Sequence, residues 1–333
     1  MVIKEGILKL FSGVLGSSAL QNYPLDYCIP LYHTVSDGPL PHLKNLYRYK
    51  SVKAFEKDLD FLGRQFRFVD WEEFTRYSDT VKRPEKKIAL LTFDDGFTEF
   101  LDVVVPILER KGIYAINFVN PAFVDQKDLM FRCKASLLAE ELLATDPDLG
   151  KLKEIPGFQL SGRDQLIRYV LASGYKKRAE LDAIADILGL YFSDYIKTHK
   201  PYLNLEDLHQ LKARGFGIAA HSWDHPYYSE LTPNEQIDST VKSLEYMKLH
   251  GFLSDGFAFP FTDFGVKNEF FDRLFSDNKM TCSFGTAGLK KDSFSRNFQR
   301  IPMEHADAAS TLKRELVYWQ VKKAFNKNII IRK

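Results

Sequence analysis

Cysteine is scarce in this chain of 333 residues, which has only three, and the three are far apart. Cys28, Cys133 and Cys282 form no CxxC pair, and an odd number at this spacing excludes a framework of disulfides. The same spacing argues against a zinc site built from cysteine. Because Cys28 and Cys282 lie in apolar, strand-like runs, we expect buried thiols at both positions.

An excess of charge of one sign is also absent. The chain has 46 Lys and Arg residues against 44 Asp and Glu residues, a net charge of +2, which argues against a nucleic-acid-binding surface. It has no low-complexity tract, no internal repeat and no long structureless linker. With 45% hydrophobic and 27% charged residues, the composition is that of a globular protein. We expect a single domain over residues 1–333, and the sequence leaves the oligomeric state open.

A long apolar run is missing as well. The segment 1–20 is mildly apolar, but Lys4, Glu5 and Lys9 interrupt it and no secretory cleavage pattern follows. The segment is too short and too polar to span a bilayer. One apolar helical face in it either docks on the protein body, which is the favoured interpretation, or touches a membrane surface. We therefore predict a cytoplasmic protein without a transmembrane segment, with a peripheral position at the cell envelope as the alternative.

Short apolar runs alternate with amphipathic segments along most of the chain. The expected strands are 28–33, 66–69, 88–93, 114–119, 216–220, 257–260, 282–284 and 299–302. The expected helices are 52–65, 98–111, 205–214, 234–250, 268–275 and 310–324. This alternation is typical of parallel βα units, and about eight of them fit a barrel or a partial barrel. The interval 125–203 breaks the rhythm and predicts a helical insertion, which either shapes a substrate cleft or only decorates the surface.

Two short motifs with acidic and histidine side chains come directly after apolar runs. They are Thr92-Phe93-Asp94-Asp95-Gly96 and His221-Ser222-Trp223-Asp224-His225-Pro226. Two imidazoles and one carboxylate are a common ligand set of catalytic zinc, and the second carboxylate is then available as a base. Since neighbours on a regular strand point to opposite faces, we expect the strand to turn at Asp94 and Asp95. Each motif alone is also compatible with an ordinary turn or a chance pair.

Together the two motifs resemble those of the polysaccharide deacetylases, the fourth family of carbohydrate esterases, whose unit is the NodB-like homology domain. The resemblance also includes Tyr32-His33, the helix at 55–59 and the strand at 257–261. It implies an α/β fold, a distorted (β/α) barrel with about seven parallel strands. It also implies a hydrolase that removes acetyl groups from an N-acetylated glycan, in envelope, capsule or exopolysaccharide metabolism.

The resemblance further implies the roles of four side chains. Asp94 would be the general base, while Asp95, His221 and His225 would bind a divalent metal, zinc by preference with cobalt or nickel as alternatives. The chain departs from the family pattern in two places. Where the third motif of the family has an arginine that orients the base, this chain has Ala258. The late Leu-x-His motif that supplies the acid has no clean match.

We expect His305 to replace the missing acid, with an exposed loop histidine as the alternative. Four other residues near the motifs are candidates for substrate contact, with core packing or a structural role as the alternative: His33, Trp223, Tyr227 and Phe261. The remaining histidines carry no supporting context and are expected at the surface: His42, His199, His209 and His250. The two departures keep open a catalytically weak protein that binds glycan or scaffolds an assembly. A hydrolase of the same fold that acts on a non-sugar amide is a third alternative.

Overall fold

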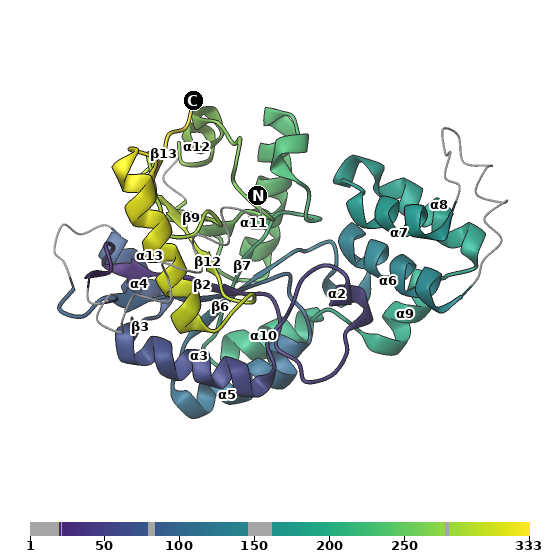
Figure 1. Ribbon diagram of the computed structural model, residues 1–333, viewed down its shortest axis with the longest axis horizontal. Coiled ribbons are helices and arrows are strands. Elements are labelled where there is room, and N and C mark those ends of the chain that lie inside the picture. The colour runs from purple at the N-terminus through teal and green to yellow at the C-terminus, as the bar shows by residue number, and fades with distance from the viewer. Residues whose placement is uncertain (1–19, 21, 79–83, 146–161, 277–279) are drawn as a thin grey trace.

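The computed structural model describes residues 20, 22–78, 84–145, 162–276 and 280–333, and a large parallel sheet lies at its centre (Figure 1). The strands are β2 (Pro30–Tyr32), β5 (Leu91–Asp94), β6 (Ala115–Val119), β7 (Gly217–Ala220), β8 (Gly256–Ala258), β9 (Cys282–Gly285), β11 (Asn297–Gln299) and β12 (Ile301–Pro302). They pair in the order β11-β9-β8-β7-β6-β5-β2-β12. Every pair is parallel.

The two edge strands of this sheet are neighbours in the sequence, because only Arg300 separates β11 from β12. The first half of the segment 297–302 pairs with β9, and its second half pairs with β2. This segment therefore acts as one strand that closes the sheet, leaving seven strands around a barrel. The predicted distorted (β/α) barrel with about seven parallel strands is confirmed.

A second, smaller sheet lies beside the barrel. Its strands are β1 (Tyr27–Cys28), β4 (Ile88–Ala89) and β3 (Arg67–Phe68), in the order β1-β4-β3. The expected strands 28–33 and 88–93 are therefore each divided between two sheets, and the breaks fall at Ile29 and Leu90. Both of these side chains are buried, so the apolar run continues across the break and gives no sign of it.

Helices cover the outside of the barrel. They include α3 (Val52–Gln65), α4 (Trp71–Ser78), α5 (Val105–Lys111), α10 (Leu205–Ala213), α11 (Pro233–Leu249), α12 (Asn268–Leu274) and α13 (Ala308–Ala324), and a π-helical turn, Phe100–Val104, precedes α5. Local signals set the start of several: Ser51 caps α3, and Thr232 and Glu235 form a reciprocal capping box with Pro233 in the first turn of α11. The six predicted helices are confirmed, whereas α4 is an addition.

Four helices form a lobe beside the barrel (Figure 1). They are α6 (Phe131–Ala144), α7 (Arg163–Ala172), α8 (Arg178–Leu188) and α9 (Phe192–His199), and the short α2 (Pro41–Lys44) packs on α6. The lobe has a hydrophobic cluster of its own, which Phe97 and Tyr202 join to the barrel. His42 lies in this region and is buried, with its Nδ1 2.8 Å from the Tyr195 hydroxyl, so its expected surface position is wrong. The bounds 125–203 of the insertion stay a prediction.

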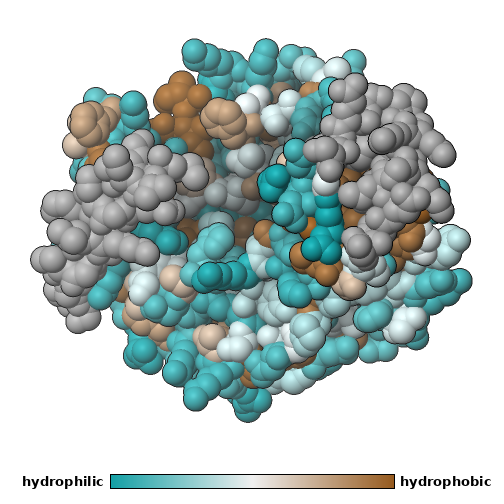
Figure 2. Space-filling view, turned by 45° about the vertical axis from the view of Figure 1, so that its right-hand side comes forward, coloured by the Kyte–Doolittle hydropathy of each residue, from teal (hydrophilic) through white to brown (hydrophobic). Residues whose placement is uncertain are grey.

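The buried and exposed surfaces agree with several expectations from composition. All three cysteines are buried and none forms a disulfide. In the described part of the chain, no helix has the length and apolar character needed to cross a membrane. Figure 2 shows one face that is mainly hydrophilic, with a hollow near its centre. The apolar helical face expected within residues 1–20 falls almost wholly outside the described residues.

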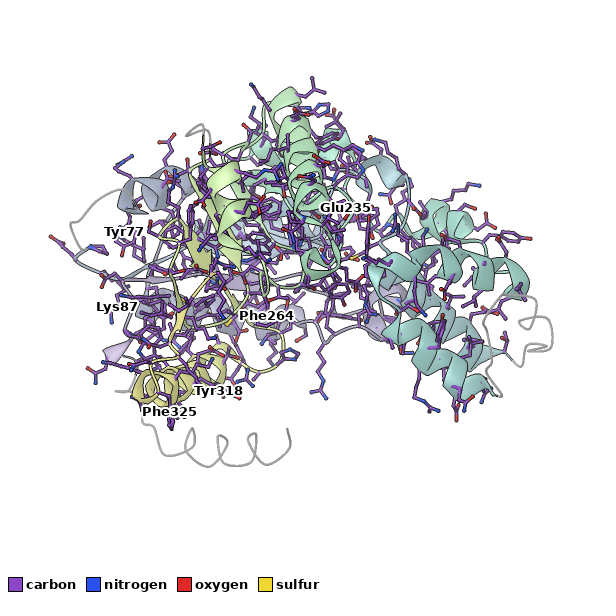
Figure 3. The ribbon with its side chains drawn as sticks, turned by 90° about the horizontal axis from the view of Figure 1, so that it is seen from above. Tyr77, Lys87, Glu235, Phe264, Tyr318 and Phe325 are labelled. Carbon is purple, nitrogen blue, oxygen red and sulfur yellow. The ribbon has the colours of Figure 1, made fainter. Side chains whose placement is uncertain are left out.

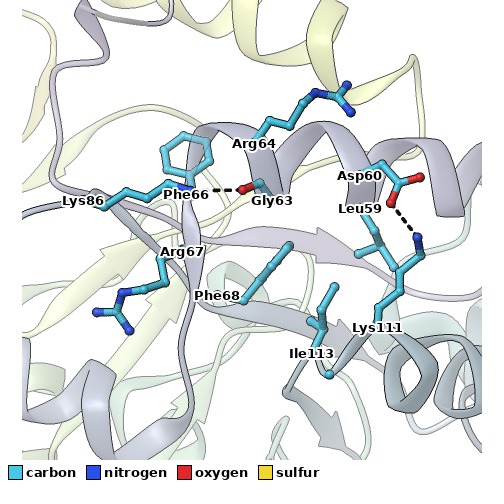
Figure 4. A pocket seen from close by; sticks show the side chains of 11 residues that line it. Leu59, Asp60, Gly63, Arg64, Phe66, Arg67, Phe68, Lys86, Lys111 and Ile113 are labelled. Atoms are coloured by element: carbon cyan, nitrogen blue, oxygen red, sulfur yellow. Dashed lines mark hydrogen bonds and ion pairs between the residues drawn. The ribbon is translucent and has the colours of Figure 1, made fainter.

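One pocket lies at the amino ends of the strands (Figure 4). It has a volume of about 470 Å³ and lies against α3, with Gly112 and Ile113 on its wall just before β6. Lys111 forms an ion pair with Asp60 at its edge. Because the polar motifs follow the carboxyl ends of the strands, this pocket is separate from the candidate site.

The C-terminal segment is held to the barrel by a buried cation. Strand β13 (Ile329–Ile330) pairs in parallel with β10 (Lys291–Asp292), which directs Arg332 inward. The Arg332 guanidinium donates to both carboxylate oxygens of Asp292, at 2.9 and 2.6 Å, and forms an ion pair with buried Asp263. One guanidinium therefore neutralises two carboxylates that have little access to water.

This cluster borders the strand that closes the barrel. Asn297 and Gln299, both on β11, donate their side-chain amides to Asp263, at 2.9 and 2.7 Å. The same two amides reach Asp292, at 2.9 and 3.2 Å. The barrel seam and the C-terminal segment thus share one buried polar network.

Arg332→Met should lower the free energy of unfolding by about 3–5 kcal/mol, because it leaves two buried carboxylates without their cation. Lys333→Met is the matched control, since Lys333 is exposed and its loss should stay within about 0.5 kcal/mol. Urea unfolding curves measure both. Equal stability of the two variants would mean that the Arg332 cluster is not a stabilising network.

Candidate functional site

The first motif begins where β5 ends. Asp94 is the last residue of β5, and Asp95 and Gly96 have left-handed backbone, with φ of +76° and +72°. The expected turn at Asp94 and Asp95 is therefore confirmed. Glycine is required at position 96, because a Cβ there would lie 3.0 Å from Cγ1 of Val119 in a backbone region that other residues avoid. The turn gives the two adjacent carboxylates different partners.

The second motif forms a tight loop after β7. Ser222 and His225 also have left-handed backbone, with φ of +67° and +60°. The loop is held by the Ser222 hydroxyl, which accepts from the backbone N–H of His225 at 3.2 Å, and by the Asn120 side-chain amide, which donates to the carbonyl of His221. Unfavourable backbone held by local hydrogen bonds is a common property of functional sites.

Asp95, His221 and His225 converge at the carboxyl end of the barrel. The three are buried, and one potential ligand atom from each lies within 4.8 Å of the others. Oδ1 of Asp95 is 3.1 Å from Nε2 of His225 and 3.6 Å from Nε2 of His221. Oδ1 of Asp95 and Nε2 of His221 are buried without a hydrogen-bond partner, as expected for atoms that bind a cation. This group could hold a metal ion.

The protonation of this group also fits a cation. Nδ1 of His221 lies 2.9 Å from the carbonyl of Ala258 and donates to it, which leaves the lone pair on Nε2. Burial, with the neighbouring His225 and Arg300, holds the pKa of His221 well below its usual value. Burial alone would raise the pKa of Asp95, but His225, His33 and His221 hold it below normal. A neutral imidazole and an ionised carboxylate are the forms that bind metals such as zinc, cobalt or nickel.

Asp94 is held by a cation that sequence reasoning missed. The Arg300 guanidinium donates to both carboxylate oxygens of Asp94, at 2.6 and 2.8 Å, and both side chains are buried. The expectation that the site lacks an orienting arginine, based on Ala258, is wrong, because the cation comes from the segment that closes the barrel. The signal was an arginine inside the predicted strand 299–302. Oδ2 of Asp94 lies 3.5 Å from Nε2 of His221, which places the pair beside the metal-binding group.

His33 follows β2 at the same end of the barrel and is held by Glu304. Its Nδ1 and its backbone N–H both lie 2.8 Å from Oε1 of Glu304. Burial lowers the pKa of His33, but the Glu304 carboxylate and the nearby Asp95 and Asp94 raise it to about 9. The ring of Tyr47 lies 4.7 Å from that of His33, and its hydroxyl is buried without a hydrogen-bond partner.

His305 does not share this environment. It is exposed, whereas its neighbour Glu304 is buried against His33. The structure therefore does not bring His305 into contact with Asp94, and its predicted catalytic role is unsupported by the geometry. Sequence reasoning chose the histidine of the pair 304–305, while the glutamate is the residue that points into the barrel end.

The three aromatic candidates divide into two groups. The rings of Tyr227 and Phe261 are stacked, with centroids 3.7 Å apart, and Phe261 lies 4.4 Å from the ring of His225. Phe131 of the helical lobe packs against both, at 6.0 and 6.1 Å. Trp223 instead lies under the ammonium group of Lys242, 3.6 Å away, on the outside against α11. Tyr227 and Phe261 therefore border the metal-binding group, and Trp223 is engaged elsewhere.

Comparisons with known proteins agree with this geometry. Residues 81–151 match the family model described as polysaccharide deacetylase. No curated protein matches the sequence. The Streptococcus pyogenes deacetylase PplD, solved in complex with acetate, is 15% identical with a TM-score of 0.55, and the match covers 87% of this chain and 97% of that one. IcaB from Ammonifex degensii is 16% identical with a TM-score of 0.55, over 87% and 96% of the two chains.

A third solved structure, the de-N-acetylase from Aggregatibacter actinomycetemcomitans, is 13% identical with a TM-score of 0.53, over 87% of this chain and 99% of that one. At these identities the structural matches establish a shared fold, which is the predicted barrel. With the match over 81–151, the predicted resemblance is confirmed, and the family match supports the predicted hydrolase class.

His221→Ala and His225→Ala should each abolish zinc retention, and Asp95→Ala should weaken it markedly, because each removes one of the three converging ligand atoms. His209→Ala is the matched control, since His209 is exposed on α10. Metal analysis after dialysis of each purified variant measures the effect. Full zinc occupancy in the three site variants would exclude this ligand set.

Arg300→Met should destabilise the protein by about 3–5 kcal/mol, because it leaves the Asp94 carboxylate buried and unpaired. Arg214→Met is a matched control, since Arg214 makes two 2.7 Å bonds to Glu109 but at the surface, where such pairs contribute about 0–1 kcal/mol. Adding Asp94→Asn to Arg300→Met should recover part of the loss. Thermal unfolding compares the variants, and equal effects of the two arginine changes would contradict the argument.

Proposed function

We infer that this chain, which matches the polysaccharide deacetylase family over 81–151 and shares its barrel with solved deacetylases, is a metal-dependent hydrolase that removes acetyl groups from an N-acetylated glycan. One observation carries this proposal. A buried group of one carboxylate and two imidazoles lies beside a second carboxylate, Asp94, whose two oxygens both accept from Arg300.

Asp95, His221 and His225 would hold the metal ion, with zinc favoured and cobalt or nickel as alternatives. Such an ion, when bound, polarises a carbonyl group and lowers the pKa of a water molecule. The chain contributes the fixed geometry: the Ala258 carbonyl orients His221, and Ser222 fixes the loop that carries His225. Burial excludes bulk water from the ligand atoms.

Asp94 has the properties of a general base. Arg300 fixes the orientation of its carboxylate through two hydrogen bonds. Each oxygen retains a lone pair, and Oδ2 is directed towards the metal-binding group at the His221 side. Asp94 is therefore placed to take a proton from the water that attacks the acetamide carbonyl.

We assign the acid to His33 in place of His305. Glu304 accepts from Nδ1 of His33 and favours the imidazolium, which leaves Nε2–H available to donate. The proximity of Asp95 and Asp94, which contribute to the raised pKa of His33, supports its position at the same end of the barrel. His33 would give its proton to the departing amine nitrogen when the amide bond breaks.

The stacked rings of Tyr227 and Phe261 support a carbohydrate substrate. Their edge borders His225, and aromatic faces next to a catalytic group are suited to the apolar face of a sugar ring. The structurally similar proteins also support an N-acetylated substrate, because one was solved with acetate and another is described as a de-N-acetylase. A role in envelope, capsule or exopolysaccharide metabolism belongs to this proposal.

The zinc-loaded protein should release acetate from an N-acetylglucosamine oligomer, and Asp94→Asn should lower turnover at least a hundredfold while retaining zinc, because it removes the base but no proposed ligand. Acetate is measured by a coupled assay and zinc by metal analysis. Oligomer binding without acetate release by the zinc-loaded protein would instead indicate a glycan-binding role. Near-normal turnover in Asp94→Asn would assign the base elsewhere.

The pH profile tests His33. Because the acid must be protonated, turnover should fall as the pH rises through about 9, the pKa that Glu304 gives His33. Glu304→Gln should move this alkaline limb to lower pH, since it removes the carboxylate that raises that pKa. His305→Gln serves as the control and should leave the limb in place. An alkaline limb that moves in His305→Gln but stays in place in Glu304→Gln would assign the acid to His305 instead of His33.

A further inference from the structure

The end of α13 and the strand β13 expose a ridge of apolar side chains, which we call the α13–β13 surface. Its apolar members are Val321, Phe325, Ile329 and Ile331. Phe325 and Ile331 are each 70% exposed, far more than large apolar residues usually are. Figure 3 labels Phe325 on the end of α13. Four such side chains gathered at one end of a helix indicate a contact surface.

Regular spacing groups these side chains into two pairs, one at the end of the helix and one in the segment that follows. Val321 and Phe325 are four residues apart across the last turn of α13. In the segment 329–333 exposure alternates, so that Ile329, Ile331 and Lys333 point outward while Ile330 and Arg332 do not. The buried ion pairs of Arg332 with Asp263 and Asp292 fix this alternation, because they hold the Arg332 side chain on the inner side of the segment.

Lysines surround the apolar ridge. They are Lys290, Lys291, Lys322, Lys323, Lys327 and Lys333, and none of them forms an ion pair with another described residue. Lys291 is the register partner of exposed Ile329, so their side chains share a face. Residues 316–333 contain five Lys and Arg residues and no Asp or Glu, although the whole chain has a net charge of only +2. The α13–β13 surface is therefore locally cationic.

The acidic groups closest to this surface offset only part of its positive charge. Glu315 accepts from the backbone N–H of Leu289 at 2.8 Å, and Asp292 is engaged by Arg332. Burial and then the like charge of Lys290 lower the pKa of Lys322, while the opposite charge of Glu315 raises it. Apolar side chains with several lysines beside them match the interface of an anionic lipid bilayer, where acyl chains lie just below negative headgroups.

We propose that the α13–β13 surface binds the protein to a membrane rich in anionic phospholipid. Charge complementarity selects this occupant over two others. A second copy docked face to face would bring lysines against lysines. The segment 1–20 of the same chain carries Lys4, Glu5 and Lys9, so it brings a net positive charge to a positive surface. Of these three occupants, only the phosphate headgroups of an anionic membrane carry the opposite charge.

Vesicle sedimentation of the full chain tests the proposal. The protein should sediment with vesicles of phosphatidylcholine and phosphatidylglycerol, far less with phosphatidylcholine alone, and less as salt concentration rises. The double variants Phe325→Ser with Ile331→Ser, and Lys323→Glu with Lys327→Glu, should each weaken binding at least tenfold. All four side chains are exposed, so thermal unfolding should be unchanged.

Two variants provide matched controls. Leu249→Ser removes an exposed apolar side chain at the end of α11, and Lys197→Glu reverses an exposed charge on the helical lobe. Neither should change binding. Three results would overturn the proposal: no sedimentation with anionic vesicles, equal sedimentation with neutral ones, or full binding by both double variants.

Two further measurements assign the surface to another occupant if the proposal fails. Dimerisation in sedimentation velocity that is lost in the Phe325→Ser with Ile331→Ser variant would identify a second copy. Vesicle binding lost only in Phe11→Ser with Leu15→Ser would transfer the lipid contact to the segment 1–20. Acetate release from a soluble oligomer should be unchanged in all these variants, so the outcome does not depend on the proposed hydrolysis.

Discussion

The buried ion pair between Arg300 and Asp94 joins the closure of the barrel to the chemistry of its site. Arg300 occupies the single position between the strand half that pairs with β9 and the half that pairs with β2. Its guanidinium therefore reaches the end of β5 only when the barrel is closed. The buried charge of Arg300 would be costly without Asp94, and a buried carboxylate at Asp94 would be costly without the arginine. The fold and the proposed base depend on the same contact.

Local features of the sequence were sufficient for much of this architecture. The apolar runs that end at Asp94 and His221 predicted both the strands and the place where their polar residues meet, since parallel strands deliver their carboxyl ends to one side. The predicted helix 234–250 agrees with α11, which the capping box of Thr232 and Glu235 begins. Side chains from the two motifs could be grouped because each strand and its following loop are contiguous in sequence.

Long-range pairing was not accessible in the same way. Arg300 reaches Asp94 across 206 positions, and Glu304 reaches His33 across 271, and neither contact leaves a local pattern. The family pattern placed the arginine at Ala258, so its absence there seemed to weaken the site. The histidine at 305 looked suitable by residue type, but only the alternation of buried and exposed positions after β12 distinguishes it from Glu304. The buried Asp263 and Asp292 cluster was missed because it depends on Arg332, far along the chain.

The left-handed backbone of the site lowers the free energy of unfolding of the whole molecule. Asp95, Ser222, His225 and Phe261 all have φ between +54° and +76°, and each such non-glycine residue typically costs about 1–3 kcal/mol. The rest of the fold must therefore be stable enough to keep these four residues in their left-handed backbone conformation when no cation is bound. Substitutions that raise thermal stability would be easiest to find at these positions. The same substitutions would be the first to change the coordination geometry. In this protein, thermal stability and a preformed coordination geometry therefore place opposite requirements on the same four residues.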